Sequence, residues 1–143
     1  MLLMLVMGIM EFGIMFKNYL NLAQVANVGC RSAALGSNTT VIGNYINTTA
    51  TGLGLAPARI TSQAVEYRVF DKTTQVWTGW QTLGDGTGGY NNAPCDVTHD
   101  SQIRVRLGYT YPLVTGAFLS SFVGQNGNVV LSGTAAMRRE ETP

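Results

Sequence analysis

The stretch MLLMLVMGIMEFGIMFKNYLNLAQVANVGCRSAALG (residues 1–36) decides the fold, because it predicts one long helix with two unlike halves. Over residues 1–16 every residue except Glu11 is apolar or glycine. From residue 17 onward polar and apolar side chains recur with the period of an α-helix, and Gly36 is a typical C-terminal stop. We therefore expect a continuous helix to about Leu35, apolar all round at first and amphipathic afterwards.

The amphipathic half presents an apolar stripe that a folded domain has to cover. At about 100° per residue, ten side chains fall on one side of the helix and four polar ones fall opposite. The stripe comprises Phe12, Met15, Phe16, Tyr19, Leu22, Ala23, Ala26, Cys30, Ala33 and Ala34, and the polar side comprises Lys17, Asn21, Gln24 and Arg31. The all-round apolar half suits lipid or a bundle of like helices, so we expect an anchor that continues into a docked head. The alternative is a wholly buried helix of a soluble protein, but the remaining chain is too small to wrap about ten helical turns.

Residues 37–143 predict a β-rich head, with a short second helix first. Val41, Ile42, Tyr45 and Ile46 have helical spacing after Ser37 and Asn38, which are both good N-cap residues. Four later segments alternate as strands do, at residues 64–70, 74–83, 102–111 and 128–138, and the first two are joined by a turn. We expect an α+β fold, with the long helix packed on a roughly four-stranded antiparallel sheet, and a division into an N-terminal helix (1–36) and an exported head (37–143). The segment 113–122 is expected to be a short apolar helix or a loop.

Composition excludes several classes of function. A formal net charge of +1 and scattered arginines give no electrostatic basis for nucleic-acid binding. One histidine and two distant cysteines cannot supply a zinc site, and no other metal or cofactor is expected. Cys30 and Cys95 could form a disulfide outside the cytoplasm, or remain two unpaired small apolar residues; the sequence leaves both open.

No motif supports catalysis. His99 stands beside Asp100, but no nucleophile motif of the G-x-S-x-G kind accompanies them. The stretch GDGTGG (residues 84–89) lacks the G-K-[ST] of a phosphate loop, and the aspartates lack the order of a calcium loop. We therefore expect a protein that is not an enzyme.

The stretch GIMEFGIMFKNYLNLAQVANVGCRSAALG (residues 8–36) resembles the N-terminal signature of TadE-like proteins, the minor pilins or pseudopilins of tight-adherence (Flp-type) pilus systems. The similar positions are Gly8, Ile9, Glu11, Phe12, Gly13 and Phe16, followed by residues 30–34. Tyr111-Pro112 and Ala136-Met137-Arg138 are similar to the family's C-terminal strands. Val6 stands five residues before Glu11, where the family's peptidase motif has glycine, so we expect the processing site to lie upstream.

The resemblance implies a membrane-anchored assembly subunit whose partners are other pilin-like subunits and the pilus machinery. Its location would be the bacterial inner membrane, with the head outside the cytoplasm, or an extracellular pilus. Gly8 and Gly13 would permit close helix approach, and Phe12 and Phe16 would pack against neighbours. Glu11 would pair with a cationic group of a neighbouring subunit, or lie at the lipid headgroup boundary; both interpretations remain open.

A signal-anchored surface module that binds sugar or cell-wall polymer is the alternative function. Trp77, Trp80 and Tyr90 are its candidate ligand contacts. The two tryptophans would lie on opposite faces of an unbroken strand, with one in the core, unless a bulge at Gly79 realigns them.

Overall fold

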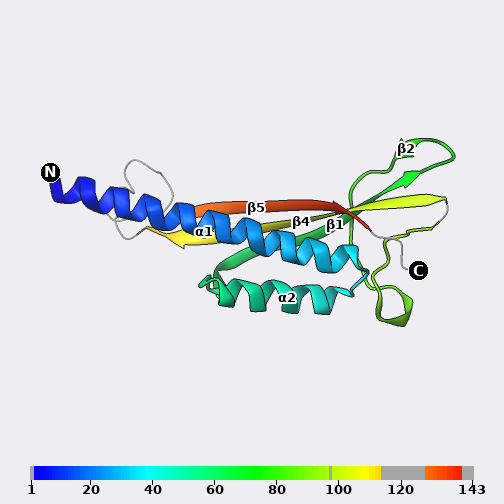
Figure 1. Cartoon of the computed structure of the whole chain (residues 1–143), viewed down its shortest axis with the longest axis horizontal. Helices are drawn as coiled ribbons and strands as arrows, with labels where there is room; N and C mark the ends of the chain where they lie inside the picture. The colour runs from blue at the N-terminus through cyan, green and yellow to red at the C-terminus, as the bar shows by residue number, and fades with distance from the viewer. Residues whose placement is uncertain (1, 97, 114–127, 140–143) are drawn as a thin grey trace.

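The computed structural model describes residues 2–96, 98–113 and 128–139, which form a two-layer α+β fold (Figure 1). Two helices, α1 (Leu2–Ala34) and α2 (Thr39–Gly52), lie on one face of an antiparallel sheet. The strands are β1 (Ile60–Asp71), β2 (Val76–Trp77), β3 (Gln81–Thr82), β4 (His99–Pro112) and β5 (Asn128–Arg138). Short 3₁₀ turns, η1 (Pro57–Arg59) and η2 (Thr87–Gly89), lie in the connections. The predicted fold class is confirmed.

Helix α1 is continuous and ends where the sequence predicts. Gly36 adopts a left-handed conformation with φ of 89°. The Gly36 N–H donates to the Ala33 carbonyl at 3.0 Å, and the Ser37 N–H donates to the Ser32 carbonyl at 3.2 Å. These two bonds form a Schellman motif, which needs a residue that tolerates positive φ.

Helix α2 begins after Asn38, one of the two N-cap residues that the sequence offers. The Asn38 side chain accepts a hydrogen bond from the Val41 N–H at 2.9 Å, which satisfies a backbone donor at the start of the helix. Ile42, Ile46 and Ala50 are buried and face α1 and the sheet. Gly29 permits this close packing, because a β-carbon there would lie 2.7 Å from Cγ1 of Ile46.

The sheet has the strand order β2-β1-β4-β5, and β3 also pairs with β1. The predicted hairpin forms between β1 and the β2 and β3 segments. Its turn is held by the Asp71 carboxylate, which accepts from the N–H groups of Thr73 at 2.7 Å and Thr74 at 3.2 Å. In the centre of the sheet β4 pairs with β1 and with β5 along most of its length.

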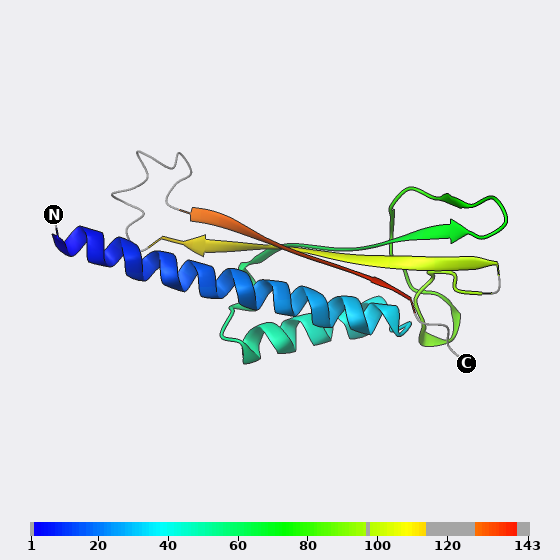
Figure 2. The same ribbon diagram turned by 45° about the horizontal axis from the view of Figure 1, so that its top comes forward.

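The core lies between the inner face of the sheet and the second half of α1, with α2 completing it (Figure 2). Alternate residues of β4 supply one wall, which comprises Ile103, Val105, Leu107, Tyr109 and Tyr111. Helix α1 supplies the other, with Leu22, Val25, Ala26, Cys30 and Ala33 fully buried.

The predicted apolar stripe is partly wrong. Phe12 and Phe16 are 63% and 53% exposed, and Tyr19 is exposed as well. Asn21, expected on the polar side, is half-buried and donates to the Leu53 carbonyl at 2.9 Å. Helix α2 packs against the flank of α1 that carries Asn21 and Gly29, so the covered sector is rotated away from the aromatic side chains.

The expectation for residues 113–122 falls almost entirely outside the described part of the chain. Only Leu113 is described there, as half-buried and packed against the core.

Candidate functional site

The first half of α1 is an apolar surface that the rest of the described chain leaves uncovered. Its first turns project beyond the ends of the strands in both views (Figures 1 and 2). The residues Leu5, Ile9, Phe12, Phe16 and Leu20 are all exposed. At about 100° per residue these five side chains fall within one sector of the helix, and we call them the open helix ridge.

The length and hydropathy needed to cross a membrane are not met by any helix over the described residues.

The two glycines in this half of α1, Gly8 and Gly13, are not packed against the rest of the described chain. A β-carbon at Gly8 or Gly13 would meet no atom of the described chain within 4 Å. Gly133 of β5 behaves differently, because a β-carbon there would lie 3.0 Å from Cγ of Leu22 and 3.1 Å from its carbonyl oxygen. Glycine is therefore required for packing at Gly133, whereas at Gly8 and Gly13 the described part of the chain sets no such requirement.

Glu11 lies on the side of α1 that faces the chain's own sheet. It is only 6% exposed, in contrast to its neighbour Phe12. Burial raises the pKa of Tyr111, and the nearby Glu11 carboxylate raises it further. The five predicted assembly residues are therefore divided: Phe12 and Phe16 face outward, and Glu11 is turned toward the end of β4.

Trp77 and Trp80 lie together on the outer face of the sheet, the face turned away from the helices, because the strand is interrupted between them. Trp77 ends β2 and pairs with Phe70, whose ring centroid is 5.0 Å from its own. The guanidinium carbon of Arg68 lies 4.5 Å from the Trp77 ring centroid and 4.9 Å from that of Trp80. Neither tryptophan belongs to the core, so the prediction that one is buried there is wrong, and the alternative of realignment is the one observed.

Tyr90 is at a different place, the corner between α1 and α2. It forms a β-bridge with Ser37, and its neighbour Asn91 donates through Nδ2 to the carbonyls of Ala33 at 2.8 Å and Ser37 at 3.1 Å. The structure thus gathers Trp77 and Trp80, but not Tyr90, into one group.

The two cysteines are not joined. Both are free in this structure, which corresponds to the second of the two possibilities that the sequence leaves open. Cys30 donates to the Ile103 carbonyl at 3.4 Å, while Cys95 faces the Arg139 carbonyl at 3.9 Å. Burial raises the pKa of the Cys30 thiol to about 11. This thiol is therefore part of the packed core.

Sequence reasoning missed a charged network on the outer face. Oε2 of Glu66 accepts from Arg104 at 2.7 Å and Oε1 accepts from Arg106 at 2.6 Å. Burial raises the pKa of Glu66, but these hydrogen bonds outweigh it and hold the pKa below 4.5. Arg104 also lies over the Trp80 ring, 4.0 Å from its centroid. The alternation of β1 and β4 predicted outward charges, but only the register of the two strands places Arg104 opposite Glu66.

The suggested pair of His99 and Asp100 does not form. The ring Nδ1 of His99 lies 3.0 Å from Asp96 instead. Hydrogen bonds from Thr98 are the main cause of a lowered pKa at Asp96. Asp100 is held by Lys72 at 3.1 Å and by Arg138. Across residues 2–96, 98–113 and 128–139, no three His, Cys, Asp or Glu side chains are grouped to hold a metal ion.

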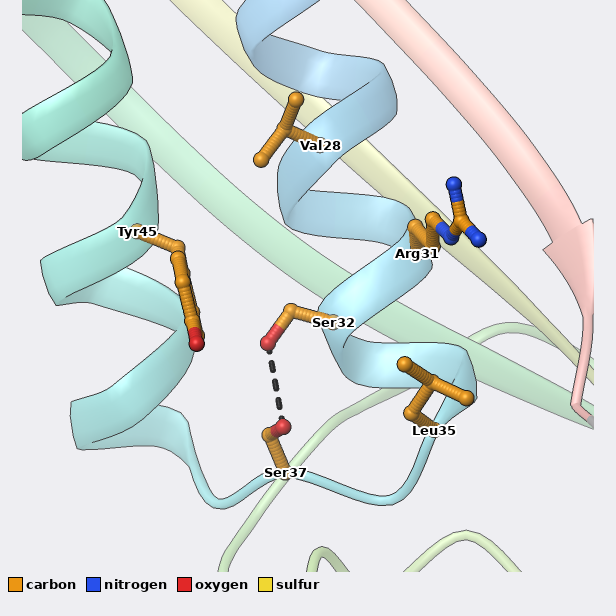
Figure 3. A pocket seen from close by; sticks show the side chains of 6 residues that line it. All are labelled: Val28, Arg31, Ser32, Leu35, Ser37 and Tyr45. Carbon is orange, nitrogen blue, oxygen red and sulfur yellow. Dashed lines mark hydrogen bonds between the residues drawn. The ribbon is translucent and has the colours of Figure 1, made fainter.

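A shallow groove of about 320 Å³ runs between α1 and α2 (Figure 3). Its lining comprises Val28, Arg31, Ser32, Leu35, Ser37 and Tyr45. The hydroxyl of Ser32 donates to that of Ser37 at 3.0 Å, and the Arg31 side chain points away from α2. Apart from these polar groups, the surface of the groove is mostly apolar.

Comparisons with protein-family models, with curated proteins and with solved structures found no match.

Proposed function

We propose that this chain is a non-enzymatic, pilin-like assembly subunit of the TadE-like type, which joins its neighbours through the first half of α1. The observation that carries the proposal is the open helix ridge, a row of large apolar side chains exposed on a helix whose other half is firmly packed. Soluble monomers rarely leave a continuous apolar surface of this kind uncovered, because each large apolar side chain gains about 1.5–3 kcal/mol when it is buried.

Packing among neighbouring helices explains the composition of this half. Small residues allow helix backbones to approach closely, and the positions of Gly8 and Gly13 are open for such an approach. Phe12 and Phe16 would then fill the spaces between neighbouring helices. The same apolar surface suits lipid, and in our proposal the subunit resides at the bacterial inner membrane, with its head outside the cytoplasm, before it assembles.

Glu11 has a structural role in this proposal. It faces the end of β4 rather than the open side, and its charge acts on Tyr111. Because it is buried on this side, the carboxylate would set the rotation of α1 relative to the head, and thereby the direction in which Phe12 and Phe16 point.

Replacing the two outward aromatic residues tests the proposal. In the double variant Phe12→Ser/Phe16→Ser we expect loss of co-purification with other pilin-like subunits, because the variant removes apolar contacts that only a neighbour provides. Both side chains are exposed, so the melting temperature of the head should not change.

Gln24→Ser/Asn27→Ser is the matched control. Both residues are exposed on the second half of α1 (residues 22–34), which is packed against the sheet and α2 and which we call the docked half. This variant should retain co-purification. Equal recovery of partner subunits with both variants would contradict the proposal.

A further inference from the structure

The face of the sheet turned away from the helices is a compact charged surface. Paired residues on neighbouring strands share a face, and the register places Glu66 beside Arg104 and Gln102 beside both Arg68 and Arg138. We call this surface the outer sheet face, and it comprises Glu66, Arg68, Gln102, Arg104, Arg106 and Arg138. It lies on the opposite side of the sheet from α1, so it is separate from the open helix ridge.

Positive charge is concentrated on this surface. Including Lys72 at its edge, it holds five of the nine lysines and arginines of the chain. Glu66 on this surface and Asp100 at its edge each contact two of these cations. Leaving Lys72 aside, the four arginines exceed these two acids by two positive charges among the described residues.

The guanidinium groups of Arg68 and Arg104 are held in place by neighbouring side chains. Arg68 donates from Nε to Gln102 at 2.8 Å and lies against both tryptophan rings. Arg104 is fixed by Glu66 on one side and Trp80 on the other. Such preorganisation reduces the conformational entropy that binding would cost.

Two arginines at the rim remain accessible. The side chains of Arg106 and Arg138 are 51% and 69% exposed, although each contacts one carboxylate. A guanidinium carries five N–H donors in a planar fork that matches a carboxylate, so a single contact leaves capacity for a second acceptor. Thr134 lies opposite Arg106 on the same face and offers a hydroxyl.

We propose that the outer sheet face binds an acidic polysaccharide, whose carboxylates contact Arg106 and Arg138 and whose hydroxyls contact the neighbouring polar side chains. A uronic-acid polymer combines spaced carboxylates with many hydroxyls, which fits a surface of arginine, threonine and glutamine with two fixed acids. The tryptophans support the arginines, so the specificity of this site is for charge, not for stacking on bare rings.

A nucleic acid fits this surface less well. A protein that makes about 6–10 phosphate contacts neutralises more charge than the four arginines of this surface provide. Base stacking needs free aromatic faces, and here guanidinium groups lie against the Trp77 and Trp80 rings.

Binding of the full chain to immobilised polygalacturonate at low salt tests the proposal. For Arg106→Gln/Arg138→Gln we expect affinity to fall about tenfold or more, since charge-assisted hydrogen bonds are lost. Arg31→Gln/Arg59→Gln removes the same charge from exposed positions elsewhere and should change affinity less than about twofold. Arg106→Lys/Arg138→Lys keeps the charge without the fork, and should give an intermediate loss.

Unchanged melting temperatures establish that the variants fold. If the glutamine variant does not fold, the lysine variant is used to test the proposal in its place. Four results would overturn the proposal: no binding by the unsubstituted chain, equal binding of a fully methyl-esterified polymer, equal losses in both glutamine variants, or tighter binding of single-stranded DNA at equal charge concentration.

Discussion

The two halves of α1 belong to one continuous helix but have opposite relations to the rest of the molecule. Between residues 22 and 34 the helix buries small and apolar side chains against the sheet and α2. Between residues 2 and 20 most large apolar side chains are exposed, while the charged Glu11 is buried. Burial along this helix therefore follows the reach of the sheet and α2, and not the hydrophobicity of the residue. Apolar residues that the fold does not cover are the ones available to a partner.

The largest contrast is expected between two leucines. Leu22 is fully buried and Leu20 is exposed, although they are two residues apart. Leu22→Ala should lower the free energy of unfolding by about 2–5 kcal/mol, because it removes core contacts and leaves a cavity. Leu20→Ala should change it by less than about 0.5 kcal/mol. Urea denaturation followed by tryptophan fluorescence measures both, and equal effects would break the distinction between the halves.

Two glycines, Gly133 and Gly13, test the same difference between the two halves of α1. Gly133→Ala should cost about 1–3 kcal/mol, because the new methyl group would press on the Leu22 side chain and backbone. Gly13→Ala meets no atom of the described residues within 4 Å and should be neutral, or stabilising by up to about 1 kcal/mol through helix propensity. Thermal melts of the two variants compare them directly. A destabilised Gly13→Ala variant would indicate that the chain covers its own first half.

The pH dependence of stability tests whether Cys30 is buried away from solvent in the docked half of α1. Its folded pKa of about 11 lies above the ordinary 9.0, so the folded state retains a proton that the unfolded state releases first. The resulting stability is fully present below about pH 9 and should be lost as the pH rises toward about 11. Denaturation at a series of pH values should show this loss, and Cys30→Ala should reduce it. A cysteine placed at exposed Phe16 should add no such dependence.

The smallest effect concerns Glu11, the buried carboxylate of the first half. Glu11→Gln removes the negative charge that acts on Tyr111, so the pKa of Tyr111 should fall. Ultraviolet titration of Glu11→Gln, compared with the same titration of Glu11→Gln/Tyr111→Phe, separates the signal of Tyr111 from that of the other tyrosines. If the pKa of Tyr111 does not change, Glu11 does not lie close to Tyr111 and our placement of its side chain is wrong.

Local patterns predicted the elements well, since caps, turns and alternation act over a few residues. The Gly36 stop, the Asn38 cap and the Asp71 turn lie where the sequence indicated. What could not be predicted depends on contacts distant in sequence. The placement of α2 rotated the buried sector of α1 away from Phe12, and strand register assembled Glu66, Arg104 and Arg106. An interrupted strand put both tryptophans on one face.

Disulfide scanning along α1 tests the central claim most directly, namely that its first half is covered by neighbouring subunits and not by its own chain. In a background without Cys30 and Cys95, single cysteines would replace Ile9, Phe12 and Phe16 of the open helix ridge, and Leu22 and Val25 of the docked half. After mild oxidation of the assembled protein, we predict crosslinks between subunits at the three ridge positions and none at the two docked positions. Crosslinks at Leu22 and Val25, or none at the ridge in an assembly that is otherwise intact, would contradict the account.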